Sequence, residues 1–142
     1  MACLITGNCQ GCQACVRRCP TQAITGDRHQ VHQIDPMRCI DCGTCGRVCP
    51  YDAVVDNAGQ PAQRMKRSEW LQPVIVHSVC VACGLCINIC PVSCLDLDGF
   101  AVHIPPEGFP FLKNLADCVG CGFCAAICPV GAVQMRSRAA VK

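Results

Sequence analysis

Cysteine is the residue type in this sequence that could do the most chemistry. The chain has 18 cysteines among 142 residues, a density typical of a disulfide scaffold or of metal binding by thiolates. Sixteen of them fall into four copies of one pattern, in which three cysteines recur at every third residue and a fourth follows four residues later, directly before a proline. The four copies occupy residues 9–20, 39–50, 80–91 and 118–129.

The spacing of the first three cysteines favours an iron–sulfur cluster. Three thiolates at every third residue wrap around one corner of a cubane, while the intervening backbone N–H groups face its sulfides. Structural zinc prefers two C-x2-C pairs separated by a longer insert, so a third cysteine repeated four times favours [4Fe–4S] clusters. Glycine at 43, 84 and 122 permits positive φ. The first copy has Gln13 there, so we expect its loop to differ slightly.

The elements that position these cysteines are short. The proline after each fourth cysteine disfavours helical geometry at that cysteine, so one helical turn should end there and the thiolate should face away from the other three. A small residue and an aliphatic one then predict a turn into a short strand. These pairs are Ala23-Ile24, Ala53-Val54, Cys94-Leu95 and Ala132-Val133.

We therefore expect an α+β fold in which each half runs strand, cluster loop, helical turn, strand, strand, cluster loop, helical turn, strand. Gly26-Asp27 and Asp98-Gly99 supply turn chemistry for the central hairpins. The stretch around Gly59 and Pro61 lacks the motif. The expected division is a first module at 1–58, a linker at 59–73, a second module at 74–136 and a polar tail at 137–142.

Composition favours a reducing cytoplasm. The N-terminus has no basic and apolar signal-peptide regions, and no segment approaches the roughly 18 apolar residues of a membrane-spanning helix. The formal net charge is +2 with neutral cysteines. Each cluster with four thiolates contributes about −2 when oxidised, so the loaded protein is acidic and the nominal charge does not favour a nucleic-acid partner. The basic run at Arg64, Lys66 and Arg67 reads as a solvated linker.

The sequence contains no glycine-rich phosphate loop, no G-x-G-x-x-G and no Ser/His/Asp pattern. We therefore expect no flavin, nicotinamide or organic substrate site, and no enzyme activity of its own.

These motifs resemble the bacterial two-cluster ferredoxins, with residues 74–136 resembling the module a second time. The resemblance implies four [4Fe–4S] clusters, in which each fourth cysteine ligates the other cluster of its pair. Carried over, the ligand sets are Cys9, Cys12, Cys15 and Cys49; Cys39, Cys42, Cys45 and Cys19; Cys80, Cys83, Cys86 and Cys128; and Cys118, Cys121, Cys124 and Cys90.

Two pairings of the motifs stay open. The first and second motifs begin 30 residues apart, which favours sequential pairing. In four-cluster subunits of molybdopterin oxidoreductases similar to dimethyl sulfoxide reductase, however, the first motif pairs with the fourth and the second with the third. The two pairings use the same sixteen cysteines and differ only in which cluster each fourth cysteine ligates.

The remaining candidates have simpler interpretations. Cys3 and Cys94 are expected to be small buried side chains beside a cluster. His77 precedes a motif that is already complete, so we do not expect it to be a ligand. His29, His32 and His103 lie on strand-like stretches and are expected to be exposed or cross-strand. Trp70 is expected to anchor the linker and 105–110 to form an exposed loop.

The predicted function is electron transfer in a complex. Four clusters suggest a path between fixed endpoints, as in the electron-transfer subunit of a cytoplasmic oxidoreductase. Expected partners are a tungsten or molybdenum enzyme such as an aldehyde oxidoreductase, a hydrogenase or a flavin subunit, together with further copies of the chain. Interface candidates are Trp70, Phe109 and Phe111. The alternatives are a free soluble polyferredoxin and an iron–sulfur redox sensor.

Overall fold

The structure, a computed structural model, describes residues 2–97 and 108–141. It divides into two compact units, Met1–Arg67 and Ser68–Lys142. The α+β fold expected from the sequence is confirmed, because short strands alternate with helices of five residues in both units. Each unit is described below by itself.

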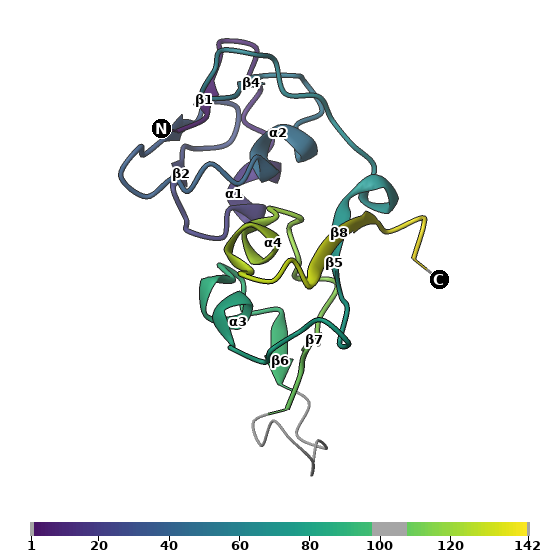
Figure 1. The fold of residues 1–142 in the computed structure, drawn as a ribbon. Helices are drawn as coiled ribbons and strands as arrows, with labels where there is room; N and C mark the ends of the chain where they lie inside the picture. Colours follow the sequence, from purple (N-terminus) through teal and green to yellow (C-terminus); the bar gives the residue numbers. More distant parts are fainter. Residues whose placement is uncertain (1, 98–107, 142) are drawn as a thin grey trace. The chain divides into compact units, whose positions relative to one another are not determined.

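The first unit contains two antiparallel strand pairs and two helices (Figure 1). Its elements are β1 (Leu4–Ile5), α1 (Ala14–Arg18), β2 (Ile24–Thr25), β3 (Gln33–Ile34), α2 (Thr44–Val48) and β4 (Val54–Val55). Pairing of β1 with β4 places Ile5 opposite Val54, so the chain start lies beside the strand that follows the second motif. The β2–β3 hairpin places Ile24 opposite Ile34 and connects the two motifs.

The second unit repeats this order with longer strands (Figure 1). Its elements are β5 (Leu71–Ile75), α3 (Leu85–Ile89), β6 (Leu95–Leu97), β7 (Pro110–Leu112), α4 (Phe123–Ile127) and β8 (Val133–Ser137), after the 3-10 helix η1 (Arg67–Glu69). Pairing of β5 with β8 places Ile75 opposite Val133, and pairing of β6 with β7 places Leu95 opposite Leu112.

The segment expected to be a linker, 59–73, is largely part of the two units. After β4 the chain folds back, so that Pro61 forms a bridge with Val55 and the Ala62 N–H donates to the Val54 carbonyl at 2.9 Å. Glycine at position 46 lets this segment pack against α2, because a Cβ there would clash with the Cβ of Ala62. From residue 71 the segment belongs to β5.

The segment expected to be a polar tail, 137–142, starts within a strand. Ser137 is the last residue of β8 and lies opposite Leu71. The Arg138 N–H donates to the Trp70 carbonyl at 2.9 Å, and the Arg138 guanidinium lies 5.5 Å from the centroid of the Trp70 ring. Trp70 is only 1% exposed. This burial agrees with the expectation that Trp70 anchors the linker segment, whereas the side chain has almost no surface left for the partner contact that was also expected of it.

His32, expected to be exposed or cross-strand, is the second of these: it lies across the β2–β3 hairpin from Gly26. It is only 1% exposed, because Gly26 leaves room for its ring: a Cβ there would lie 2.7 Å from Cδ2 of His32. In the loop expected to be exposed, residues 105–107 lie outside the described residues, but Pro110 begins β7 and is fully buried. His103 also lies outside the described residues, whereas His29 is exposed as expected.

Candidate iron–sulfur centres

All four cysteine motifs share one backbone conformation. Each has three residues with φ between 49° and 81°, at the same places in every copy. These are Gly11, Asp41, Ala82 and Gly120; Gln13, Gly43, Gly84 and Gly122; and Gln22, Asp52, Ser93 and Gly131. Gln13 has φ 68°, close to the glycines that occupy its place in the other copies. The expectation that the first loop differs is therefore wrong, since a glutamine adopts the left-handed conformation there.

The third and fourth cysteines are fixed by the helices between them. In each copy the third cysteine is the second residue of a five-residue helix. The fourth is the residue after the helix, with φ between −72° and −66° and ψ between 115° and 118°. This extended geometry is the one that the following proline favours, and it turns the thiol away from its own loop.

One hydrogen bond recurs at every fourth cysteine. The backbone N–H four residues later donates to its sulfur, at 3.2 to 3.4 Å. The donors are Ala23, Ala53, Cys94 and Ala132, paired with Cys19, Cys49, Cys90 and Cys128. The small residue that follows each proline in the sequence is thus the donor that holds the thiol in place.

These geometries bring the sixteen motif cysteines around four cavities. Each cavity is lined by three cysteines of one motif and the fourth cysteine of another. The four sets are Cys9, Cys12, Cys15 and Cys49; Cys19, Cys39, Cys42 and Cys45; Cys80, Cys83, Cys86 and Cys128; and Cys90, Cys118, Cys121 and Cys124. The structure therefore places motif one with motif two, and motif three with motif four.

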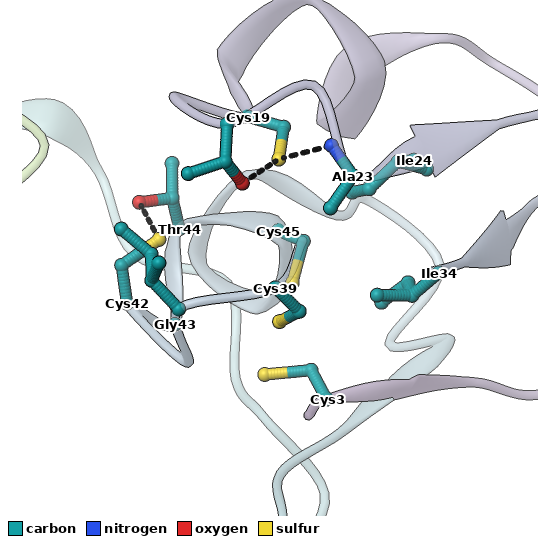
Figure 2. A pocket seen from close by; sticks show the side chains of 12 residues that line it. Cys3, Cys19, Ala23, Ile24, Ile34, Cys39, Cys42, Gly43, Thr44 and Cys45 are labelled. Atoms are coloured by element: carbon teal, nitrogen blue, oxygen red, sulfur yellow. Dashed lines mark hydrogen bonds between the residues drawn. The ribbon is translucent and has the colours of Figure 1, made fainter. Parts of the chain in front are cut away.

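Figure 2 shows the cavity that the second motif forms with Cys19. Cys39 and Cys45 direct their sulfurs into a common space, Cys42 borders it from one side, and Cys19 reaches it from the end of α1. Cys42 Sγ lies 3.2 Å from Thr44 Oγ1. Ile24 and Ile34 from the β2–β3 hairpin close the apolar side.

The four cavities suit a group larger than one metal ion. In the described part of the chain, no three His, Cys, Asp or Glu side chains converge closely enough to hold a single ion. Sulfur ligands around a nearly apolar cavity of this kind fit an iron–sulfur cluster.

Comparison with known families agrees with this geometry. The sequence model of the 4Fe-4S dicluster domain matches residues 8–53 and again residues 79–132, and a related dicluster model matches residues 38–95. The chain belongs to the 4Fe-4S dicluster ferredoxins. It is a tandem of two bacterial-type modules and carries multiple [4Fe–4S] clusters. Iron–sulfur proteins of this ferredoxin-like kind are electron carriers rather than catalysts.

Individual ferredoxins and complexes are also similar to this chain. An uncharacterized ferredoxin-like protein of Haemophilus influenzae is 34% identical over 87 residues, which cover 54% of this chain and 94% of that protein. The ferredoxin from Thauera aromatica is 40% identical, covering 48% of this chain and 88% of its own, with a TM-score of 0.35.

A chain in the formate dehydrogenase–heterodisulfide reductase–formylmethanofuran dehydrogenase complex from Methanospirillum hungatei is 22% identical and has a TM-score of 0.38. The match covers 94% of this ferredoxin-type chain and 54% of that one, so this chain spans about half of its length. Within the described residues of this chain, no helix is both long and apolar enough to span a bilayer.

Burial keeps several of the cluster-lining thiols protonated in the absence of metal. It raises the pKa of Cys15 to about 11 and that of Cys124 to about 12. A hydrogen bond from Cys94 lowers the pKa of Cys118 to about 6. Since thiolates are the form that binds metal, these two thiols would have to lose their protons to serve as ligands. Metal binding by them would release protons and would be favoured by higher pH.

Two cavities each contain a fifth sulfur. Cys3 lines the cavity that contains Cys39, and Cys94 lines the cavity that contains Cys118. Both side chains are buried, as the sequence predicts. The Cys3 thiol donates to Asp41 Oδ1 at 3.2 Å, and Cys94 Sγ lies 3.5 Å from Cys90 Sγ.

The electrostatics keep these two sulfurs as thiols. Hydrogen bonding to Cys45, followed by burial, raises the pKa of Cys3. Hydrogen bonding to Cys118, again with burial, raises the pKa of Cys94. A sulfur that retains its proton can donate to a neighbouring thiolate but is a poor metal ligand.

We predict that Cys3→Ser and Cys94→Ser each retain the full iron content, because a hydroxyl can replace a donating thiol. The measurement is an iron and acid-labile sulfide assay after anaerobic purification, with Cys121→Ser as the matched control that should lose iron. Loss of a cluster in Cys94→Ser would mean that Cys94 is a ligand.

Proposed function

We propose that the chain carries four [4Fe–4S] clusters and is the electron-transfer subunit of a cytoplasmic multi-subunit oxidoreductase. The observation that carries the proposal is the set of four cavities, each with three cysteines of one motif and the fourth of its partner motif. Four cysteine sulfurs are the usual ligand set of a [4Fe–4S] cluster. When bound, each cluster would supply reversible one-electron transfer.

The proposed ligand sets follow the four cavities. They are Cys9, Cys12, Cys15 and Cys49; Cys39, Cys42, Cys45 and Cys19; Cys80, Cys83, Cys86 and Cys128; and Cys118, Cys121, Cys124 and Cys90. In this assignment the N–H groups of Ala23, Ala53, Cys94 and Ala132 orient the crossing thiolates and stabilise their charge.

Two of the sixteen proposed ligands are exposed, Cys12 in the first unit and Cys83 in the second. Electron transfer between proteins requires a cluster edge near the surface, so we assign electron entry and exit to the clusters held by these cysteines. Around Cys83 the cavity lining includes Val81, Leu85 and Val130, which are 58%, 40% and 40% exposed. Exposed apolar side chains grouped in this way favour contact with another protein.

We therefore assign a catalytic oxidoreductase subunit as the partner that binds near Cys83. The candidate classes are a tungsten or molybdenum enzyme, a hydrogenase and a flavin subunit. Phe111 remains a candidate contact, since it is 39% exposed. Phe109 stacks on His77 with ring centroids 5.2 Å apart. The cytoplasmic location is part of the proposal, because sixteen ligand thiols must stay reduced until they bind iron.

A free polyferredoxin is the second candidate. It is favoured by the Haemophilus influenzae relative, a short ferredoxin-like protein that this chain matches over 94% of its length. The two candidates differ in whether the loaded chain has a lasting partner, so the experiment below separates them.

The crossed ligand sets predict the effect of Cys19→Ser. Although Cys19 belongs to the first motif, the variant should damage the cluster held by Cys39, Cys42 and Cys45, since Cys19 lines that cavity. Iron should fall from about sixteen to about twelve atoms per chain if the cluster is lost, or to about fifteen if it becomes [3Fe–4S]. Electron paramagnetic resonance (EPR) should show the change.

Cys12→Ser is the reference for damage to the first-motif cluster, since Cys12 lines the other cavity of the unit. A Cys19→Ser spectrum that matched the Cys12→Ser spectrum would contradict the ligand map.

The partner assignment predicts that the chain co-purifies from its source cells with a catalytic subunit at moderate salt. Val81→Glu should weaken this association, because it puts a charge into the apolar surface around Cys83. Met37→Glu is the control, an apolar-to-acidic change at a more exposed position in the first unit, where Met37 is 91% exposed. Recovery of the wild-type chain alone, as a monomer with all its clusters, would contradict the subunit proposal and favour the free polyferredoxin.

A further inference from the structure

His32 is a buried polar side chain in the wall of an iron–sulfur cavity. It is 1% exposed and lines the cavity of Cys9, Cys12, Cys15 and Cys49. A histidine buried to this extent needs hydrogen-bond partners for its ring nitrogens. Its partners are Cys9, whose sulfur is 3.4 Å from Nδ1, and Gln13, whose Nε2 is 3.0 Å from Nε2 of His32.

The partners of Gln13 fix where the ring carries its proton. Gln13 Nε2 lies 2.9 Å from the Gly26 carbonyl oxygen, which only accepts, so the amide NH₂ must face Gly26. The same NH₂ group is a donor toward His32, so Nε2 of the ring must accept. A ring that accepts at Nε2 has its proton on Nδ1. That N–H points to Cys9 Sγ.

The surroundings of His32 are specialised for this contact. A Cβ on Gly26 would lie 2.7 Å from the imidazole ring. Gln13 has φ 68°, in a place where the other three motifs have glycine. A non-glycine residue pays a conformational penalty in the left-handed region, yet the glutamine amide makes two hydrogen bonds that a glycine could not.

The second unit provides an internal comparison. Ile24 pairs with Ile34 as Leu95 pairs with Leu112, so His32 and Pro110 occupy equivalent places, each two residues before the paired one. Both are buried, and Pro110 lines the cavity of Cys80 as His32 lines that of Cys9. Proline has no side-chain donor, and the counterpart of Gln13 is Gly84. Only the first unit places a histidine donor there.

We propose that His32 donates its Nδ1–H to the Cys9 thiolate and makes the cluster of this cavity easier to reduce than its counterpart at Cys80. A hydrogen bond to a ligand sulfur stabilises negative charge, and reduction adds one electron, so the reduced state gains more than the oxidised state. The electron comes from an external reductant; no bond is formed or broken and the proton stays on Nδ1. This inference rests on the proposed ligation by Cys9.

The test is an EPR-monitored redox titration of the full-length protein, with iron and sulfide assayed in every sample. In His32→Leu one reduction step should become less favourable by about tenfold in its equilibrium constant, or about 59 mV for one electron. The other steps should stay in place. In His32→Asn the same step should stay close to its wild-type potential, because the Asn NH₂ can donate from near the position of Nδ1.

Two further variants complete the test. Cys12→Ser alters the cluster of the same cavity, so the EPR signal it changes should belong to the step that His32→Leu moves. Gln13→Gly introduces the residue that the other motifs already have and releases the ring from its fixed tautomer. It should shift the same step in the same direction by a smaller amount, and it carries the test if His32→Leu loses iron.

Three results would overturn the inference while leaving the proposed function intact: no shift in variants that retain all clusters, equal shifts in His32→Leu and His32→Asn, or a shift in a step other than the one marked by Cys12→Ser. A Cys9→Ser variant that kept every cluster unchanged would instead overturn the proposed ligand map, and this inference with it.

Discussion

The closure of every cavity by a cysteine from a partner motif is the constraint on which the rest of the structure depends. A three-residue spacing provides three sulfurs, and a fourth must come from elsewhere in the chain. The proline after each fourth cysteine ends the helix, and the N–H four residues later holds the sulfur at 3.2 to 3.4 Å. Among the described residues, each unit therefore forms two cysteine-lined cavities that connect its two motifs reciprocally, and neither of these is complete without the other motif.

This constraint explains how units with so little apolar material can fold. In the first unit, Cys3, Cys15, Cys45 and Cys49 make up most of the buried cluster, beside Ile24, Ala53 and Val54. The second unit is similar among its described residues, with Cys86, Cys94, Cys118 and Cys124 buried beside Leu95 and Val133. Strands of two to five residues add few backbone hydrogen bonds. Metal–thiolate bonds that link distant parts of the chain supply folding free energy in such proteins, so the proposed clusters are structural as well as redox groups.

The parts of the structure that repeat could be predicted from the sequence, because the same local rule acts four times. The helical turn before each proline, the strand after it and the order of elements follow from residue types within a few positions. Positive φ at Gln13, Gln22 and Ser93 could not be predicted, since nothing local makes these residues left-handed. Burial of His32 depends on the missing side chain of Gly26, and burial of Trp70 on strand pairing about 65 residues apart in sequence. The short first interval favoured sequential pairing of the motifs, but the spacings alone left the crossed arrangement open.

The most direct test of this account is the iron and acid-labile sulfide content of anaerobically purified protein. Four [4Fe–4S] clusters predict about sixteen iron and about sixteen sulfide per chain. The same sample should show no stoichiometric zinc, and chelation of its iron should unfold both units. A content near eight of each, or zinc in place of iron, would contradict the account.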